Sequence, residues 1–301
     1  MNRLAPIVLF TYKRLDTLKQ TISALQENDF ATSSELFIFS DAAKIERDVE
    51  LIQAVRSYLK TVSGFKRTTI FEAETNKGLA NSIISGVSQI IAEYEKVIVL
   101  EDDLKTTPNF LAFMNSCLNH FEKEQAVFSI SGYAFDFGPL KDYEHDIYFL
   151  NRGWSWGWAT WKDRWESVDW AAKAYTSFQK DKQAKRAFSQ GGSDLNSMLR
   201  KQMEGKLDSW AIRWFFHQYQ VNGLTVYPVS SKVSNHGFDE NATHTKTASK
   251  RYVPVIDKSC KTKFAFPEKT EVTSAYQRKF QRRMGISARI KSKLEGFFKL
   301  R

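Results

Sequence analysis

Cysteine is scarce in this sequence, and long apolar runs are missing. The two cysteines, Cys117 and Cys260, lie far apart and do not have the spacing of metal ligands. We therefore expect no disulfide framework and predict two reduced thiols in a cytosolic protein. No apolar run approaches the roughly 20 residues that a membrane-spanning helix needs, and the N-terminus reads as a strand rather than a signal peptide. Aromatic residues make up 14% of the chain, which excludes disorder as its main state.

Positive charge is sparse over most of the chain, although the net charge is +10. Residues 278–301 carry nine lysines and arginines against one glutamate, so the first 277 residues account for only +2. A nucleic-acid-binding protein more often spreads its charge over the face that grips phosphate, and we expect no nucleic acid as a partner. Within the basic tail, Ile290, Leu294, Phe297 and Phe298 recur at helical spacing. This pattern predicts a helix lying on an anionic membrane surface; a solvated tail without a target is the alternative.

Strand and helix patterns alternate through the first half of the chain. Each predicted strand is a short apolar run, as in parallel strands buried on both faces. The runs are residues 6–10, 36–39, 68–71 and 97–100. The helices between them carry apolar stripes, at Leu15, Leu18, Ile22 and Leu25, at Ile45, Val49, Ile52, Val55 and Leu59, and at Leu79, Ile83, Val87 and Ile90. The alternation predicts an α/β fold with a doubly wound, mostly parallel central sheet flanked by helices.

The second half has a different composition. All eight tryptophans lie between Trp154 and Trp214. Strand-like pieces and helices are mixed in this half, the strands at residues 127–131, 147–150 and 225–229 and the helices at 195–203 and 210–220. We expect one domain over residues 1–270, with a nucleotide-binding half (1–125) and a helical, aromatic acceptor-side half (126–270), and then a basic amphipathic tail over 271–301.

Three adjacent carboxylates, Glu101, Asp102 and Asp103, directly follow the fourth predicted strand. Like charges in a partly dehydrated position repel one another, so a compensating cation is needed, and the sequence has no arginine nearby. Oxygen ligands suit Mg²⁺ or Mn²⁺, which can bridge a diphosphate and stabilise a leaving nucleotide. The alternatives are that these acids cap the helix beginning near Pro108, or that they face solvent.

Several blocks of sequence, in order, resemble those of nucleotide-sugar glycosyltransferases with the GT-A fold. The similarity is greatest to bacterial family-2-like enzymes related to the N-acetylglucosaminyltransferase I group, and it extends over about residues 5–245. The blocks are PIVLFTYKR (6–14), FSD (39–41), ETNKGLA (74–80), VIVLEDDL (97–104), RGWSWGWATW (152–161), KLDSWAIRW (206–214) and NHGFDENATH (235–244).

The resemblance implies a nucleotide site at the carboxyl ends of the strands, where Rossmann-like sheets bind their ligands. Its predicted residues are Thr11, Tyr12, Arg14, Asp41, Asn76, Gly78 and Asp102. Thr11, Tyr12 and Arg14 would hold the base and reach toward phosphate. Asp41 would accept a hydrogen bond from the base or ribose, unless it is only a turn residue at the end of its strand.

A metal ligand and a second metal contact are implied as well. Asp103 would bind the metal directly, and a histidine near the end of the catalytic domain would bind the metal or the diphosphate. Two histidines qualify: His244, which matches the bacterial pattern, and His236, which is followed by glycine as in the mammalian enzyme. We predict His244.

A general base must deprotonate the acceptor hydroxyl if the reaction inverts the sugar's configuration. Asp208 is the candidate that the resemblance implies, although the register could instead place the equivalent position at Ser209. The alternative for Asp208 is that it caps the helix that follows. Asp194 and Asp163 are weaker candidates for the base.

The tryptophan cluster has two interpretations. Trp156, Gly157 and Trp158 suit a loop that forms an aromatic floor for a sugar, and core packing is the alternative. Three further tryptophans are expected inside the protein; they are Trp165, Trp170 and Trp214. Glu101 and Arg152 complete the predicted substrate contacts, with Arg152 steadying a phosphate or stacking on tryptophan.

These features and the resemblance together predict a metal-dependent glycosyltransferase, and the resemblance implies that it inverts configuration. It would move a sugar from a nucleotide diphosphate, with UDP as the expected carrier, to a hydroxyl of a glycan or lipid-linked glycan in surface polysaccharide synthesis. We expect it in the cytoplasm, peripherally bound to the inner face of the cell membrane. A sugar nucleotidyltransferase is a rival, but it would more usually have a glycine-rich loop where residues 11–14 have no glycine. A non-catalytic carbohydrate-binding module is the other rival, although it would not need the acidic triplet.

Overall fold

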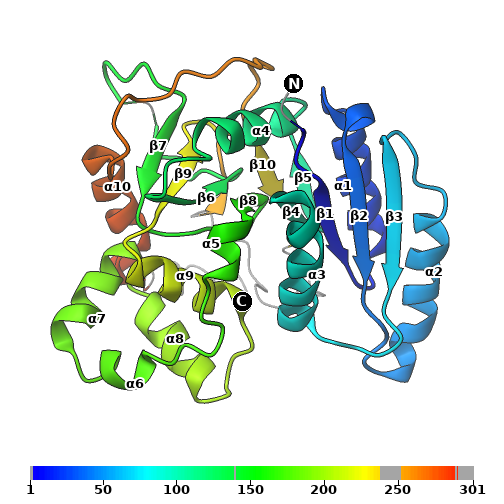
Figure 1. Ribbon diagram of the computed structural model, residues 1–301, viewed down its shortest axis with the longest axis horizontal. Helices are drawn as coiled ribbons and strands as arrows, with labels where there is room; N and C mark the ends of the chain where they lie inside the picture. Colours follow the sequence, from blue (N-terminus) through cyan, green and yellow to red (C-terminus); the bar gives the residue numbers. More distant parts are fainter. Residues whose placement is uncertain (1–2, 139, 238–251, 289, 291–301) are drawn as a thin grey trace, which may run out of the picture.

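The computed structural model describes residues 3–138, 140–237, 252–288 and 290. The first half of the chain, coloured blue to cyan, occupies one side of the molecule, and the second half, green to red, occupies the other (Figure 1). Both halves contribute strands to one sheet of eight strands, in the order β3-β2-β1-β4-β8-β6-β9-β7. These strands are β1 (Ile7–Thr11), β2 (Glu35–Ser40), β3 (Arg67–Glu72), β4 (Lys96–Glu101), β6 (Val127–Ser131), β7 (Ile147–Leu150), β8 (Trp158–Trp161) and β9 (Leu224–Pro228).

The sheet is mostly parallel, as the sequence predicts. Strands β3, β2, β1 and β4 are all parallel neighbours. β8 lies antiparallel between β4 and β6, β9 pairs in parallel with β6, and β7 closes the edge antiparallel to β9. A second, two-stranded antiparallel sheet pairs β5 (Leu104–Thr106) with β10 (Val233–Asn235).

Helices cover both faces of the large sheet because successive side chains of a strand point to opposite faces. In β1, Ile7 and Leu9 belong to the core cluster that includes residues of α1, α2, α4 and α10, whereas Val8 and Phe10 belong to the cluster that includes residues of α3, α5, α8 and α9. Within the described residues, the α-helices are α1 (Leu15–Gln26), α2 (Val49–Leu59), α3 (Leu79–Tyr94), α4 (Phe110–His120), α5 (Lys162–Glu166), α6 (Tyr175–Phe178), α7 (Lys182–Phe188), α8 (Leu195–Met203), α9 (Trp210–Gln220) and α10 (Ser274–Met284). The α/β prediction, a mostly parallel sheet flanked by helices, is therefore confirmed.

Two expectations about helix packing are wrong. Ile45 and Val49 were expected to face inward on the second helix, but their exposed fractions are 44% and 39%. The α-helix begins only at Val49, after a short 3₁₀ helix (Glu46–Asp48), so the inward stripe is reduced to Ile52, Val55 and Leu59.

The boundary expected near residue 270 also needs correction, because α10 is part of the folded body. Tyr276, Phe280 and Met284 are at most 1% exposed and belong to the core on one face of the sheet. The apolar residues of this helix are thus used in packing. Leu294, Phe297 and Phe298, on which the membrane prediction also depends, lie outside the described residues.

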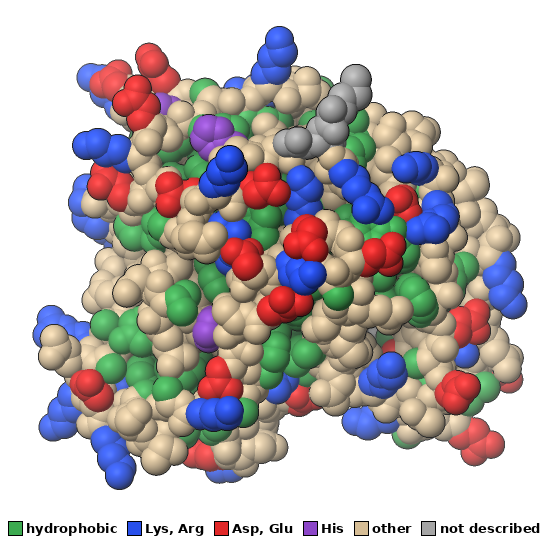
Figure 2. Space-filling model, viewed as in Figure 1, with side chains coloured by type: hydrophobic (Ala, Val, Ile, Leu, Met, Phe, Trp, Pro, Cys, Tyr) green, Lys and Arg blue, Asp and Glu red, His purple; other side chains and the backbone are tan. Residues whose placement is uncertain are grey.

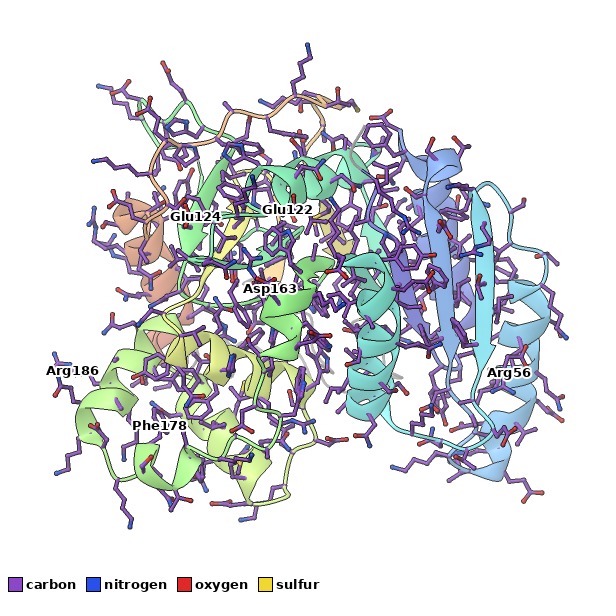
Figure 3. The ribbon with its side chains drawn as sticks, viewed as in Figure 1. Arg56, Glu122, Glu124, Asp163, Phe178 and Arg186 are labelled. Carbon is purple, nitrogen blue, oxygen red and sulfur yellow. The ribbon has the colours of Figure 1, made fainter. Side chains whose placement is uncertain are left out.

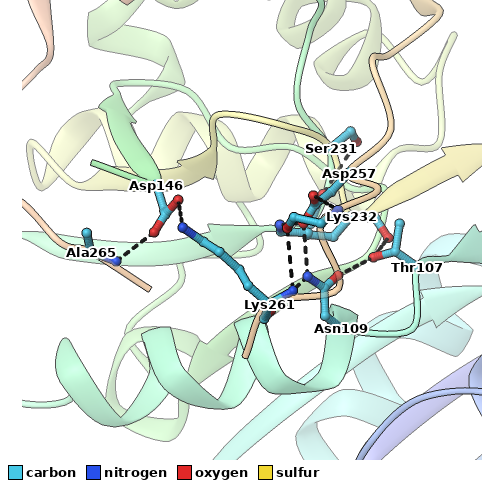
Figure 4. Close-up of polar contacts among 10 residues, drawn as sticks. Thr107, Asn109, Asp146, Ser231, Lys232, Asp257, Lys261 and Ala265 are labelled. Carbon is cyan, nitrogen blue, oxygen red and sulfur yellow. Dashed lines mark hydrogen bonds and ion pairs between the residues drawn. The ribbon is translucent and has the colours of Figure 1, made fainter. Parts of the chain in front are cut away.

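A buried polar network fastens the segment that precedes α10 (Figure 4). Lys232 forms an ion pair with Asp257, and both side chains are more than 90% buried. Asn109 donates through Nδ2 to Asp257 Oδ2 at 2.9 Å, and Lys261 pairs with Asp146 at 2.5 Å. These contacts join the residues just before β7, β10 and α4 to residues 257–261.

Charged side chains of both signs are mixed on the surface. Figure 2 shows lysine and arginine side chains interspersed with acidic ones over the face that it draws, in keeping with the small net charge of the body. Cys117 is buried, Cys260 is exposed, and neither forms a disulfide. Within the described part of the chain, no helix combines the length and apolar character needed to cross a bilayer.

Candidate active site

The site lies where the chain leaves β1 and β4, which are neighbours in the sheet. Thr11 ends β1 and donates through Oγ1 to Asp102 Oδ2 at 2.9 Å. The backbone N–H of Tyr12 donates to the same oxygen at 3.1 Å. Neighbouring parallel strands end at one edge of the sheet, so residues 91 positions apart in the sequence meet there. Thr11, Tyr12 and Asp102 are thereby brought together, as the resemblance implies.

Arg14 neutralises the acidic residues. Its Nη2 lies 2.6 Å from Asp102 Oδ1 and 2.8 Å from Asp103 Oδ2. Although burial opposes it, the two carboxylates raise the pKa of Arg14. No arginine was expected close enough to compensate the negative charge of the acidic triplet. That expectation is wrong, because Arg14, in the turn before α1, contacts two of the three acids. The prediction that Arg14 reaches phosphate stays open, since one nitrogen makes both contacts and a guanidinium has five N–H donors.

The Glu101 carboxyl holds its proton more readily than an exposed glutamate does. Burial, reinforced by the charges of Asp103 and Asp102, raises its pKa to about 8. At neutral pH the Glu101 carboxyl is therefore mostly protonated. Burial also raises the pKa of Asp103, whereas the charge of Arg14 opposes that shift. The triplet accordingly carries less negative charge than three exposed acids, and a bound cation would lower both pKa values.

The small β5–β10 sheet brings a second part of the chain to Asp103. The backbone N–H of His236, which follows β10, donates to the carbonyl of Asp103 at 2.8 Å. A β-carbon at Gly237 would overlap the Asp103 carboxylate and come within 2.7 Å of Arg14 Nη1. Glycine is therefore the residue that this close approach requires. Burial, together with Lys105, lowers the pKa of His236, so its ring is neutral at pH 7 and able to bind a cation.

A metal ion fits this site only if other groups complete its coordination. Among the residues that the structure describes, no three histidine, cysteine or acidic side chains are placed to hold a metal. The carboxylate of Asp103 has the oxygen chemistry that Mg²⁺ prefers, and Mg²⁺ is commonly held by one or two carboxylates plus substrate phosphates and water. His244, the predicted second ligand, lies outside the described residues, so its role stays a prediction.

Asp41 organises the loop that precedes α3. Its carboxylate accepts four hydrogen bonds, from the backbone N–H groups of Ala42, Lys77 and Gly78 and from the side chain of Asn76, at 2.9 to 3.2 Å. Gly78 has a φ of 73°, which favours glycine. The structure thus joins three predicted nucleotide residues, Asp41, Asn76 and Gly78, in one rigid turn. The predicted contact of Asp41 with a base or ribose remains untested.

Asp48 was not among the predicted residues. Tyr12 donates through its hydroxyl to Asp48 Oδ2 at 2.9 Å, and Lys13 Nζ lies 2.9 Å from Oδ1 of the same carboxylate. The Tyr12 hydroxyl also accepts the backbone N–H of Lys44 at 2.9 Å. These contacts fold the segment after β2 against the end of β1. No motif in the sequence marks Asp48; its low exposure of 4% is a tertiary feature.

Asp208 has no capping role, because Ser209 caps α9. The Ser209 hydroxyl accepts the backbone N–H of Ile212 at 3.4 Å. Asp208 is left with an exposed side chain (66%) and a long ion pair to Arg213, at 3.9 Å. A β-carbon at Gly78 would lie 3.9 Å from Asp208 Oδ2, which places this carboxylate beside the turn before α3. The capping interpretation of Asp208 is therefore wrong, and its carboxylate is available as a base.

The two weaker base candidates are engaged elsewhere. Asp194 accepts two hydrogen bonds from Arg152, at 2.8 and 2.9 Å. Asp163, on α5 (Figure 3), pairs with Arg164 at 2.8 Å. The prediction that Arg152 contacts substrate is also wrong for this conformation, because its guanidinium is buried against Asp194 and the side chain is 4% exposed.

The tryptophans form a core cluster. Trp158 is 1% exposed, and its ring centroid lies 4.5 Å from that of Trp214 and 5.6 Å from that of Trp165. The expected burial of Trp165 and Trp214 is confirmed, and Trp170 is half-buried against the same cluster. Trp158 cannot contact a sugar, since its strand position directs the ring into the core.

Gly157 and Trp156 differ in exposure. Gly157 is buried at a φ of 61°, and a β-carbon there would lie 3.2 Å from the ring of Phe110. This close approach to α4 accounts for the glycine and leaves no room for a ligand at that point. Trp156 is half-buried and lies edge-on to Tyr133, with centroids 4.8 Å apart. Of the three residues predicted as an aromatic floor, Trp156 is the one that keeps exposed surface.

Comparisons with known proteins give partial structural overlaps. No protein-family model matches the chain, and no curated protein matches its sequence. Among solved structures, the mannosyltransferase PcManGT from Pyrobaculum calidifontis, in complex with GDP-Man and Mn²⁺, is similar over 42% of this chain at 15% identity, with a TM-score of 0.32. TarS of S. aureus is similar over 45% at 16% identity, with a TM-score of 0.31. This chain spans 34% and 23% of the length of those two chains, so its function has to be inferred from its own residues.

Proposed function

We propose that the protein is a metal-dependent glycosyltransferase that moves a sugar from a nucleotide diphosphate, with UDP as the expected carrier, to a glycan hydroxyl in the synthesis of a surface polysaccharide. One observation carries the proposal. A continuous set of contacts leads from Asp102 through Thr11, Asp41 and Gly78 to Asp208. Thr11 binds Asp102 and accepts the Asp41 N–H, Asp41 accepts the Gly78 N–H, and Gly78 lies beside Asp208.

These contacts unite two kinds of chemistry at one edge of the sheet. An acidic cluster with a single arginine lies at the ends of β1 and β4, which is where open α/β sheets bind their ligands. An exposed carboxylate on a separate element, at the start of α9, lies beside the turn that begins α3. A transferase that acts on a nucleotide sugar needs both, because the leaving diphosphate and the attacking hydroxyl lie on opposite sides of the sugar carbon.

Asp103 and Arg14 would handle the diphosphate. We propose that Asp103 holds Mn²⁺ or Mg²⁺, with His244 as a second ligand. The metal would supply Lewis-acid stabilisation of the departing diphosphate, worth several kcal/mol. Arg14 would orient Asp102 and Asp103 and donate its remaining N–H groups to phosphate oxygens. Asp41 would keep the turn of Asn76 and Gly78 rigid, so that the backbone could pass close to the nucleotide.

Asp208 would act as the general base. Its carboxylate is 66% exposed and can accept a proton from an acceptor hydroxyl. Proton transfer to such a base contributes about 10²- to 10⁴-fold to a rate. Because Asp208 acts on the acceptor, its loss should leave donor binding intact. Direct attack by the activated hydroxyl inverts the configuration of the transferred sugar.

The proposal also includes the molecule that accepts the sugar and the place in the cell where transfer occurs. A glycan, free or linked to a lipid, would supply the hydroxyl, with Trp156 as a stacking surface beside it. We propose that the enzyme works in the cytoplasm, held peripherally at an anionic membrane surface where a lipid-linked acceptor would be found.

The proposal is tested by screening nucleotide sugars with Mn²⁺ and measuring both thermal unfolding and transfer. A ligand at one hundred times its Kd should stabilise the protein by about 2.7 kcal/mol. Asp103→Asn should abolish the Mn²⁺-dependent part of this stabilisation, while Asp29→Asn, at an exposed position, should retain it. If no nucleotide sugar stabilises the native protein, or if Asp103→Asn responds as the native protein does, the proposal is wrong. Glycan binding that survives without any transfer would favour a carbohydrate-binding module.

A further inference from the structure

A basic groove of about 360 Å³ lies along α10, away from the residues of the proposed active site. Its lining residues come from α10, from the chain just after it and from the segment after β6; they are Lys279, Arg282, Arg283, Ala288, Asp136 and Phe137. Three cationic side chains therefore face one acidic side chain. The oxygen Oδ1 of that acid, Asp136, already accepts the backbone N–H of Gly138 at 3.2 Å.

The walls of the groove are held in place by the core. Tyr276, Phe280 and Met284 fix the inner side of α10, each at most 1% exposed. Lys279 Nζ donates to the carbonyl of Phe137 at 2.6 Å, which ties the helix to the opposite wall. The carbonyl of Met284 accepts the hydroxyl of Ser193 at 2.7 Å. The groove is therefore a feature of the folded body.

Lys279 and Arg282 are the two cationic side chains of the groove whose charge a ligand can use. Over the described part of the chain, no ion pair joins Lys279 or Arg282 to an acidic side chain. Arg282 is exposed and Lys279 is half-buried. A phosphate group can thus be met by a charged N–H from each residue, and the groove has room for a phosphate with organic substituents.

Two large exposed apolar side chains follow α10 in the sequence. Ile286 and Ile290 are 68% and 54% exposed, and neither is among the residues that line the groove. Proteins that lie in a membrane interface combine exposed apolar side chains, at the acyl boundary, with basic ones at the headgroups.

We infer that the α10 groove binds the phosphate group of an anionic phospholipid at a membrane surface, with Ile286 and Ile290 inserted beside it. This places the membrane contact on the folded body rather than solely on the distal tail. The inference does not depend on the proposed transferase activity, because its residues are separate from Asp103, Arg14 and Asp208.

Vesicle sedimentation of the full-length protein tests the inference. The probe is phosphatidylcholine alone or mixed in equal parts with phosphatidylglycerol. A juxtamembrane basic residue contributes about 1 kcal/mol, or roughly fivefold in affinity. The double variant Lys279→Gln/Arg282→Gln should therefore bind the mixed vesicles about thirtyfold more weakly. The matched control, Lys182→Gln/Arg186→Gln, removes the same charge from exposed positions on α7, where Figure 3 labels Arg186. It should bind like the native protein.

Two further measurements distinguish the groove from other sources of binding. Ile286→Ser should weaken vesicle binding but leave the affinity for inorganic phosphate, measured by calorimetry, unchanged. A shortened chain that ends at residue 290 should still bind the mixed vesicles. This binding should still weaken when Lys279 and Arg282 are replaced by glutamine. Three results would each overturn the inference: equal losses in the α7 and α10 variants, phosphate binding without vesicle binding, and complete loss of binding in the shortened chain. Because these assays involve no sugar transfer, their outcome is independent of the proposed activity.

Discussion

Arg14 lies 2.8 Å from Asp103 and uses the same nitrogen to bind Asp102. Two carboxylates that follow β4 thus share a single cation from the turn after β1. This sharing leaves each acid incompletely neutralised, and the raised pKa of Asp103, which comes first from burial, reflects that.

Removing the cation should therefore destabilise the fold. Arg14→Met leaves two poorly solvated carboxylates unpaired, and breaking such a pair costs about 3 kcal/mol. Urea denaturation measures the loss. The control is Arg200→Met, which breaks an exposed pair with Glu204 on one turn of α8 and should cost about 0.5 kcal/mol or less.

Mn²⁺ should partly restore the stability of Arg14→Met, because a divalent cation replaces the missing charge. The rise in melting temperature with Mn²⁺ should be larger for this variant than for the native protein. If Arg14→Met and Arg200→Met lower the free energy of unfolding equally, Asp102 and Asp103 do not need the charge of Arg14.

Gly237→Ala should disrupt the site without unfolding the protein. The added methyl group would overlap the Asp103 carboxylate and displace it from Arg14. Nucleotide binding in the presence of Mn²⁺, followed by calorimetry, should weaken at least tenfold. Gly205→Ala is the control: its β-carbon meets open space at a φ of 68°, so it should lose only the roughly 1 kcal/mol of stability that a positive φ costs. Unaltered binding by Gly237→Ala would show that Asp103 has no part in it.

Adjacent residues at the start of α9 should have separable effects. Asp208→Asn removes the proposed base from an exposed position and should lower kcat by about 10²- to 10⁴-fold while the melting temperature and donor KM stay near native values. Ser209→Ala removes the cap and should cost about 1 kcal/mol of stability with kcat largely retained. Steady-state kinetics and thermal unfolding check both. The assignment fails if Asp208→Asn loses stability while keeping its turnover.

The buried pair of Lys232 and Asp257 should make stability depend on acid pH. Burial alone raises the pKa of Asp257, but hydrogen bonds from Asn109, Lys232 and Ser259 outweigh it and hold the pKa well below its usual range. Folding thus lowers the pKa of Asp257, and the ionised carboxylate stabilises the folded protein. This stabilisation is fully present above about pH 3.9, the pKa in the unfolded chain, and it is lost as the pH falls toward the pKa of the folded protein.

Comparing the native protein with Asp257→Asn isolates that contribution. At pH 7 the variant should be less stable by about 3 kcal/mol, since it leaves the Lys232 ammonium buried and unpaired. Below about pH 4 the difference in the free energy of unfolding should shrink, as native Asp257 begins to take up its proton. A difference that stays constant from about pH 7 to about pH 3 would contradict the assignment.

Local patterns predicted much of the fold. The runs that gave β1, β2 and β4 are mostly buried, whereas β3, at the edge of the sheet, is only partly buried. The helices expected at 195–203 and 210–220 have those bounds. β8 was missed because WATW follows a glycine-rich stretch and carries no alternation of polar and apolar residues. β5 and β10 were missed because they have three residues each, and a strand that short is defined by its partner.

The site was predicted in part because strand ends are visible in a sequence whereas long-range pairs are not. Thr11, Asp41, Asn76 and Asp102 follow predicted strands, and the resemblance implied roles for them and for Gly78. Other contacts depend on the order of the strands in the sheet, which the sequence does not reveal. Arg14 pairs with acids 88 and 89 positions away, and Tyr12 pairs with Asp48. Trp158 and Arg152 were misplaced because no pattern distinguishes a tryptophan that stacks on tryptophan from one that stacks on sugar.

The most direct test is a crystal structure of the protein soaked with MnCl₂ and UDP, with the metal located from its anomalous scattering. We expect a manganese peak bound to the Asp103 carboxylate and to the diphosphate, with the uracil and ribose beside Thr11, Tyr12 and the Asp41 turn. A manganese peak elsewhere, or bound UDP with no metal at Asp103, would contradict the proposed function.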